Sequence, residues 1–92
     1  MMNLNVVLFK NSNCDLCKLM QQELMNNPPN ADITILHVKH FYSREIAIKE
    51  NITEYPTIII YNGENEITRR SGFIDSKTID KILKEYETEC VV

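Results

Sequence analysis

Apolar residues along the chain group into short segments with two different periods. Three dense runs are rich in β-branched residues, which is typical of buried strands, and a fourth, more polar run is expected to form an edge strand. These runs cover residues 5–9, 33–38, 57–61 and 66–70. Three other segments repeat apolar residues every three or four positions, as one face of a helix does. They cover residues 15–25, 44–50 and 76–86. The order β-α-β-α-β-β-α predicts an α/β fold with a central four-stranded mixed sheet flanked by three helices.

Polar residues between these segments are expected to cap the helices and to form the turns. Short polar side chains accept the free N–H groups at a helix start. The expected caps are Ser12 or Asn13, then Ser43, and then Asp75 or Ser76. Asn51 suits the left-handed position after the second helix, and Asn62-Gly63 predicts a tight hairpin turn. The segment from Glu87 to Val92 is expected to be a frayed tail.

The composition is that of an ordinary globular domain. The 92 residues are enough for a single domain, residues 1–92, and they carry a net charge of -3. This mild acidity argues against nucleic acid as a partner, and the adjacent pair Arg69-Arg70 is expected to be solvated. No apolar run approaches the roughly 20 residues of a membrane span, and the N-terminus lacks the pattern of a signal peptide. We therefore expect a cytoplasmic protein with no membrane partner, and we expect it to be a monomer.

Two of the three cysteines, Cys14 and Cys17, form a Cys-x-x-Cys motif between the first strand and the first helix. The free N–H groups and the positive dipole end of a helix stabilise a thiolate, and the thiolate is the form of cysteine that attacks disulfides. The second cysteine lies one helical turn further on, close enough for the two to form a disulfide. In a cytoplasmic protein this motif indicates redox chemistry rather than a structural disulfide, although zinc sites use the same spacing.

A second motif, Tyr55-Pro56-Thr57, precedes the apolar run and the Asn62-Gly63 turn, and Gly72 follows the fourth strand. Together with Cys14-x-x-Cys17 upstream, this block resembles the thioredoxin superfamily over nearly the whole chain. The resemblance implies a thioredoxin fold in which Pro56 is cis and faces the cysteine pair. A proline at that position has no N–H donor, exposes the backbone of Tyr55 to an extended substrate, and blocks a metal from the two sulfurs.

The chain departs from the two main subfamilies at identifiable positions. Thioredoxins carry Trp-Cys-Gly-Pro-Cys, whereas this chain has Asn13-Cys14-Asp15-Leu16-Cys17 and no tryptophan. The position of the buried acid of thioredoxins is apolar here, near Leu8. The glutaredoxin aromatic between the cysteines is absent, and the glycine pair after the last strand is reduced to Gly72. Lys10 and Asp75 correspond to positions that hold the charges of glutathione in glutaredoxins. The chain thus resembles a small glutaredoxin-like thioredoxin.

The resemblance and the place of the motif imply separate roles for the two cysteines. Cys14, at the helix tip, is expected to attack, and Cys17 to resolve the mixed disulfide. The substrate-binding rim is expected to comprise Leu16, Tyr55, Pro56 and Phe73. The charge of Asp15 should oppose the Cys14 thiolate and raise the pKa of that thiol. A less stable thiolate favours the disulfide form, which predicts a reducing protein.

The leading interpretation is a thiol–disulfide oxidoreductase that acts as a protein-disulfide reductase on protein or glutathione-mixed disulfides. It would be recharged by thioredoxin reductase or by glutathione, and it needs no cofactor beyond glutathione as a co-substrate. A non-catalytic binding module of the same fold and a metal or iron–sulfur carrier are the alternatives. His37 and His40 could join the cysteines in a zinc site, but nothing in the spacing fixes one, so no metal is expected. Cys90 is expected to be a bystander, with a regulatory or intermolecular disulfide as the alternative.

Overall fold

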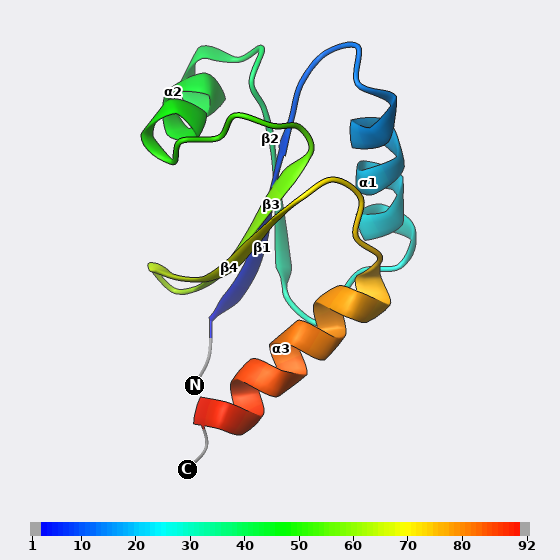
Figure 1. Ribbon diagram of the computed structural model, residues 1–92, viewed down its shortest axis with the longest axis vertical. Helices are drawn as coiled ribbons and strands as arrows, with labels where there is room; N and C mark the ends of the chain where they lie inside the picture. The colour runs from blue at the N-terminus through cyan, green and yellow to red at the C-terminus, as the bar shows by residue number, and fades with distance from the viewer. Residues whose placement is uncertain (1–2, 91–92) are drawn as a thin grey trace.

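The computed structural model describes residues 3–90, Cys90 by its backbone alone. The strands are β1 (Leu4–Lys10), β2 (Asp32–His37), β3 (Thr57–Asn62) and β4 (Asn65–Ser71). The helices are α1 (Asp15–Asn26), α2 (Phe41–Lys49) and α3 (Ser76–Cys90). This order, which can be followed by colour in Figure 1, confirms the predicted fold class.

The four strands form one mixed sheet in the order β2-β1-β3-β4. The central strand β1 runs parallel to β2 and antiparallel to β3, and β4 is antiparallel to β3. Parallel neighbours need a crossover connection, and α1 supplies it between β1 and β2. The C-terminal ends of these two strands therefore lie side by side, with Lys10 opposite His37. The loop to Cys14 departs from this end of the sheet.

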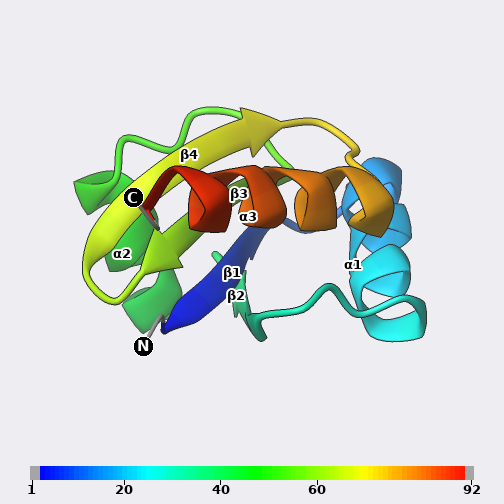
Figure 2. The ribbon, with the colours of Figure 1, turned by 90° about the horizontal axis from the view of Figure 1, so that it is seen from below.

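Side-chain alternation along the inner strands gives each face of the sheet its own apolar cluster. The cluster on the side of α1 and α3 is built on Val6, Leu8, Met20, Leu24, Ile58, Ile60, Ile79 and Leu83. The cluster under α2 contains Val7, Phe9, Val38, Ala47 and Ile59. Figure 2 shows α1 and α2 on opposite sides of the strands. Burial on both faces explains why β1 and β3 are continuous apolar runs.

The start of α2 differs from the prediction, whereas the start of α3 agrees with it. Helix α2 begins at Phe41 after His40 as its N-cap residue, so the predicted cap Ser43 is wrong. Ser43 lies inside the helix and is buried, because its position on the helix faces the sheet. At α3, Asp75 caps as predicted: its Oδ1 accepts the N–H of Thr78 at 3.0 Å.

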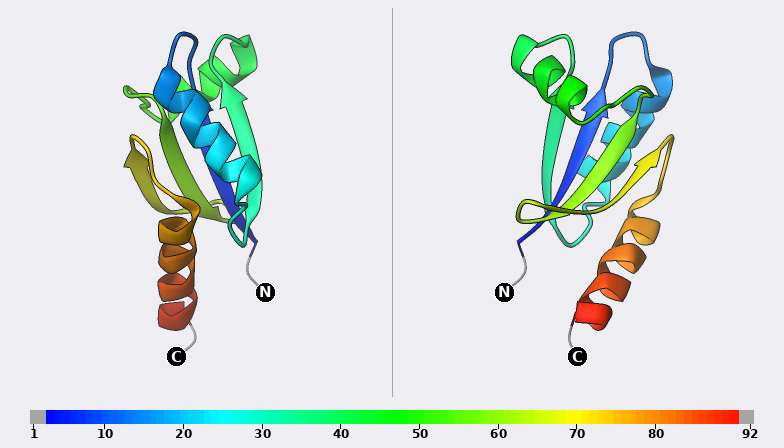
Figure 3. Two further views of the ribbon diagram at one scale, coloured as in Figure 1. Left: turned by 90° about the vertical axis from the view of Figure 1, so that its right-hand side faces the viewer. Right: turned by 60° about the vertical axis from the view of Figure 1, so that its left-hand side comes forward.

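Helix α3 is longer than predicted. It continues to Cys90 instead of ending near Tyr86, so the frayed tail expected from Glu87 is wrong as far as Cys90. The Tyr86 hydroxyl accepts a hydrogen bond from Asn62 Nδ2 at 3.1 Å, which holds the late turns of α3 on the end of β3. Figure 3 shows how far α3 extends past the sheet. The Cys90 side chain, Val91 and Val92 lie outside the described residues. Within residues 3–90, no helix has the length and apolar character needed to cross a membrane.

The hairpin between β3 and β4 turns one position later than Asn62-Gly63 predicts. Asn62 still pairs with Asn65 in the ladder, so the turn is Gly63-Glu64. Gly63 has a φ of 61°, and a glycine with positive φ at the first turn position is the pattern of a type II′ hairpin. Asn51, after α2, has a φ of 58°, which confirms the left-handed conformation expected for it.

Candidate active site

The loop between β1 and α1 places Cys14 at the start of the helix. Asn13 has a φ of 56°, a left-handed conformation that asparagine tolerates better than most residues. Cys14 is the N-cap residue of α1, and its Sγ accepts the N–H of Cys17 at 3.1 Å. The predicted cap at Ser12 or Asn13 is therefore wrong, because the cysteine sulfur itself occupies that role. The sulfur lies at the positive end of the helix dipole.

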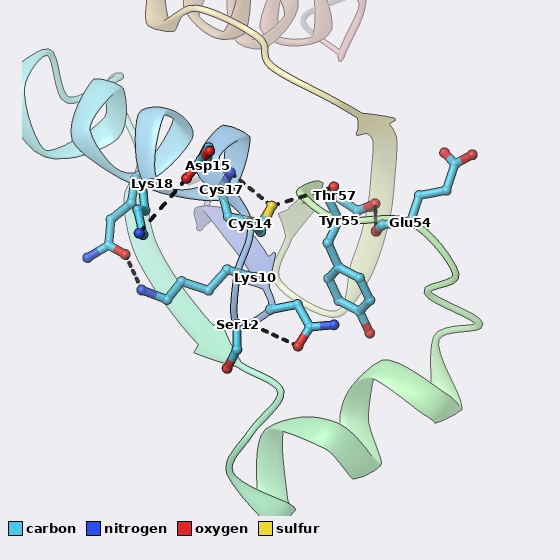
Figure 4. The surroundings of a disulfide bond; sticks show 11 residues. Lys10, Ser12, Cys14, Asp15, Cys17, Lys18, Glu54, Tyr55 and Thr57 are labelled. Carbon is cyan, nitrogen blue, oxygen red and sulfur yellow. Dashed lines mark hydrogen bonds and ion pairs between the residues drawn. A yellow bond between two sulfur atoms is a disulfide. The ribbon is translucent and has the colours of Figure 1, made fainter.

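Cys14 and Cys17 are joined in a disulfide, and their Cα atoms are 5.2 Å apart. Figure 4 shows the pair at the first turn of α1 with the loop of Tyr55 facing it. Cys14 is half-buried, whereas only 1% of the surface of Cys17 is exposed. A substrate from solution can therefore reach the first sulfur and not the second.

The segment before β3 faces the first sulfur with backbone rather than with a side chain. Cys14 Sγ lies 3.9 Å from the carbonyl oxygen of Tyr55, and the Tyr55–Pro56 peptide bond is cis. The Thr57 hydroxyl donates to the carbonyl of Glu54 at 2.6 Å and closes this turn. The ring of Tyr55 points away from the sulfur in Figure 4 and packs against the cluster under α2. What Tyr55 offers at the site is its carbonyl oxygen.

The two apolar side chains predicted for the rim lie on the first turn of α1 and on the β4–α3 loop. The N–H of Gly72 donates to the carbonyl of Pro56 at 2.8 Å. This hydrogen bond places Phe73, the next residue, beside the proline loop, the segment before β3 that contains Pro56. Leu16 and Phe73 are 41% and 47% exposed. Phe73 also lines a shallow hollow with Leu19, a residue that the sequence did not single out. The sequence could not show that Leu19 lies near Phe73, because their proximity depends on how the β4–α3 loop passes α1.

Glu23 connects α1 to the start of α3. Its Oε2 accepts the N–H of Ser76 at 2.8 Å, so this half-buried carboxylate helps to hold the loop that carries Phe73. Hydrogen bonds from the hydroxyl and the N–H of Thr78 hold the pKa of Asp75 below its usual value. Asp75 thus serves as a helix cap, and a role toward glutathione stays a prediction.

Lysine and histidine side chains gather where β1 and β2 end. Lys10 Nζ donates to Gln21 Oε1 of α1. His37 Nδ1 accepts the N–H of Lys39 at 3.1 Å, and the rings of His37 and His40 meet edge to face with centroids 5.9 Å apart. In the part of the chain that the structure describes, no three His, Cys, Asp or Glu side chains are grouped closely enough to hold a metal ion.

Two neighbours of the cysteine pair bear on its chemistry. The side chain of Asp15 is fully exposed, and Lys18 Nζ lies 4.0 Å from its Oδ1, so a cation partly offsets its charge. Leu8 is completely buried within the cluster on the α1 side. An apolar side chain therefore fills this position of β1.

The fold and this disulfide define a class. An accessible sulfur at a helix start, joined to a buried sulfur one turn on and faced by a proline loop, makes this a dithiol protein with the thioredoxin fold. The chain belongs to the thioredoxin family, whose family model, described as Thioredoxin, matches residues 2–85. Family membership and the joined cysteine pair identify it as a thiol–disulfide oxidoreductase.

Solved structures confirm the fold. Thioredoxin-2 of a malaria parasite aligns with a TM-score of 0.78 at 17% identity, covering 91% of this chain and 84% of that one. Thioredoxin of Fasciola hepatica aligns with a TM-score of 0.72 at 25% identity, covering 89% and 80%. Thioredoxin 1 of Thermosipho africanus aligns with a TM-score of 0.71 at 23% identity, covering 94% and 97%. A comparison with curated proteins gives no significant match.

Proposed function

We propose that this protein reduces disulfides in other proteins, or disulfides that proteins form with glutathione, through Cys14 and Cys17. The observation that carries the proposal is the unequal exposure of the joined cysteines: Cys14 is half-buried, and Cys17 is 1% exposed. An accessible sulfur can meet a large substrate, while a buried one can react only with its neighbour. This division suits an attacking and a resolving thiol.

The reaction begins from the reduced pair. The Cys14 thiolate attacks one sulfur of the substrate disulfide, forms a mixed disulfide, and releases the other substrate sulfur as a thiolate. Cys17 gives its proton to the released substrate thiolate and attacks Cys14 Sγ, which releases the second substrate thiolate and forms the Cys14–Cys17 disulfide. Two electrons have then passed to the substrate. In the disulfide form the N–H of Cys17 lies 3.1 Å from Cys14 Sγ. During the first step the same N–H stabilises the attacking thiolate.

The direction of electron flow is part of the same proposal. Asp15 is adjacent to the nucleophile, and its negative charge disfavours the thiolate relative to the disulfide. We expect a reduction potential between roughly -230 and -270 mV, the range from reducing glutaredoxins to thioredoxin. Measuring the potential of the pair, with either glutathione or thioredoxin reductase as the electron source, would also identify the recycling system. A cytoplasmic setting fits such a reductant.

Reduction of insulin disulfides, with dithiothreitol as the electron source, tests the proposal. Wild type is expected to turn over insulin and Cys14→Ser to be inactive. Cys17→Ser is expected to lose turnover, and when it is reduced and freed of dithiothreitol before insulin is added, it should accumulate a mixed disulfide with substrate, visible by mass spectrometry. Cys90→Ser leaves the motif intact and serves as the control. If folded wild type does not reduce insulin, the protein is a binding module and the proposed activity is wrong.

A further inference from the structure

Lysine and histidine side chains gather at the C-terminal ends of β1 and β2, the end of the sheet from which the loop to Cys14 departs. We call Lys10, His37, Lys39 and His40 the basic corner. Lys10 ends β1 opposite His37 at the end of β2, and the His37 ring contacts Lys39 N and the His40 ring. Lys10 precedes the loop to Cys14, and Figure 4 shows it in the surroundings of the disulfide. Lys10 therefore ties the corner to the end of the sheet from which the loop to Cys14 departs.

No carboxylate neutralises this corner in the part of the chain that the structure describes. The ion pairs found there use Lys18 and Arg69 as cations, and none uses a residue of the basic corner. Desolvation, followed by the charges of Lys39, Lys10 and His40, lowers the pKa of His37, so the positive charge of the corner comes from its two lysines. In a chain of net charge -3, this is a local excess of positive charge.

Two aromatic side chains extend the corner onto the first turn of α2. Phe41 and Tyr42 are 69% and 76% exposed, and they directly follow His40. Figure 1 shows α2 at the same end of the sheet as the loop before α1. Large exposed apolar side chains next to charge mark interaction surfaces, and aromatic residues often supply most of the binding energy at such surfaces.

We propose that the basic corner, with Phe41 and Tyr42, docks an acidic segment of the protein substrate that flanks the disulfide to be reduced. Charge complementarity speeds encounter and selects the partner, while the aromatic pair supplies desolvated contact area. The occupant is a polypeptide because the corner lies at the same end of the sheet as Cys14, for which we propose protein disulfides as substrates. This inference rests on the proposed function and adds a substrate preference to it.

Synthetic peptides with one internal disulfide test the preference. One peptide carries Asp and Glu beside its cysteines, and a second carries Asn and Gln at the same positions. At low salt we expect the ratio of kcat/KM values, acidic over neutral, to be about tenfold, and to approach one at 0.5 M salt, where screening is strong. Lys39→Glu should abolish or invert the ratio. The matched control is Lys81→Glu, at an exposed position of α3, and it should leave the ratio unchanged.

Binding is measured separately so that docking and chemistry can fail independently. Serine versions of both peptides, which cannot react, are titrated while amide NMR signals are followed. The acidic peptide should shift signals of the basic corner and of Phe41 and Tyr42, and Phe41→Ala should weaken its binding several-fold. Met25→Ala, at a residue that is 62% exposed on α1, is the control.

Three results would overturn the inference. Equal kcat/KM values for the two disulfide peptides would remove the preference while leaving the reductase activity intact. Equal shifts from the acidic and neutral serine peptides would show that charge does not select the partner. A DNA oligonucleotide that binds the corner as tightly as the acidic peptide would identify a general polyanion patch. If the serine peptide binds as expected but neither disulfide peptide is reduced, docking stands and the proposed function fails.

Discussion

At the scale of single residues, Cys14 combines two roles that usually belong to different side chains. Its sulfur caps α1 by accepting the N–H of Cys17, and the same sulfur is the accessible member of the disulfide. A thiolate accepts such a hydrogen bond more strongly than a disulfide sulfur does. The cap therefore favours the reduced, ionised state of Cys14. Neighbouring charges raise or lower the pKa of this thiol and the reduction potential of the pair.

Asp15 is the neighbour whose charge opposes that state. In Asp15→Asn we expect the pKa of Cys14 to fall and the reduction potential to become less negative by on the order of 10 mV, since about 30 mV corresponds to a tenfold change in the equilibrium. The effect is small because the Asp15 side chain is fully exposed and Lys18 lies 4.0 Å away. Thiolate absorbance against pH and a glutathione redox titration give the two values.

The matched variant for this prediction is Lys18→Gln. Removing the cation leaves the Asp15 charge unopposed, so the pKa of Cys14 should rise and the potential should become more negative. A pKa that moves in the same direction in both variants, or that does not fall in Asp15→Asn, would show that charge at this helix start does not set the potential.

Sequence alone located the joined cysteines and the proline segment that faces them, but not the direction of every side chain. The Cys14–Cys17 motif and the Tyr55-Pro56 segment were found because both are local patterns. The orientation of the Tyr55 ring was missed because it depends on the cluster under α2, which comes from other segments. The cap by Cys14 was missed because sulfur is not among the usual capping groups.

At the scale of elements, one arginine links β4 to the end of α2. Arg69 Nε and Nη2 donate to the two carboxylate oxygens of Glu66 at 2.8 and 2.7 Å, and Nη1 donates to the carbonyl of Glu50 at 2.7 Å. Arg69 thus makes these hydrogen bonds in addition to being solvated, since its side chain is 37% exposed, and Arg70 is exposed. The sequence could not show this because Glu50 approaches β4 only in the folded chain.

We expect Arg69→Gln to lower the free energy of unfolding by about 1 kcal/mol at pH 7, as measured by urea denaturation. The estimate is modest because both side chains of the Arg69–Glu66 pair are more than a third exposed. Arg70→Gln is the control and should change the free energy by less than about 0.5 kcal/mol. An equal loss in both variants would mean that Arg69 has no special role.

The same pair predicts a pH dependence. The hydrogen bond from Arg69 lowers the pKa of Glu66 from its ordinary value of 4.5. A lowered carboxyl pKa adds stability that is fully present above the unfolded-state pKa and is lost as the pH falls through the folded-state pKa. The difference between wild type and Arg69→Gln should therefore be constant above about pH 6 and shrink below about pH 4.

The types and order of the elements could be predicted because the periods of strands and helices, two and 3.6 residues, are local patterns of the sequence. Element ends followed less well. Ser43 predicted a cap by its chemistry but is buried within α2, and α3 persists beyond Tyr86 because Asn62 binds the tyrosine hydroxyl. Such ends depend on partners that are remote in sequence.

At the scale of the whole molecule, the sheet is shared by two apolar clusters. Val6 and Leu8 of β1 face one side, and Val7 and Phe9 face the other. A chain of 92 residues has a total stability of only about 5–14 kcal/mol. Neither cluster is therefore expected to persist without the other, and unfolding should be a single cooperative transition.

Phe9 is the place to test this coupling, because it is fully buried and is the largest side chain of the cluster under α2. Phe9→Ala should cost about 3–5 kcal/mol, which at roughly 4–8 °C per kcal/mol lowers the melting temperature by about 12–40 °C. Phe9→Leu should cost less and keep the transition measurable, and Ile48→Ala, 64% exposed on α2, should change little. Far-ultraviolet circular dichroism and the reactivity of the reduced cysteines should report the same midpoint, because β1 links the cluster under α2 to the helix that carries the disulfide. Separate midpoints would show that the α2 layer melts independently of the active site.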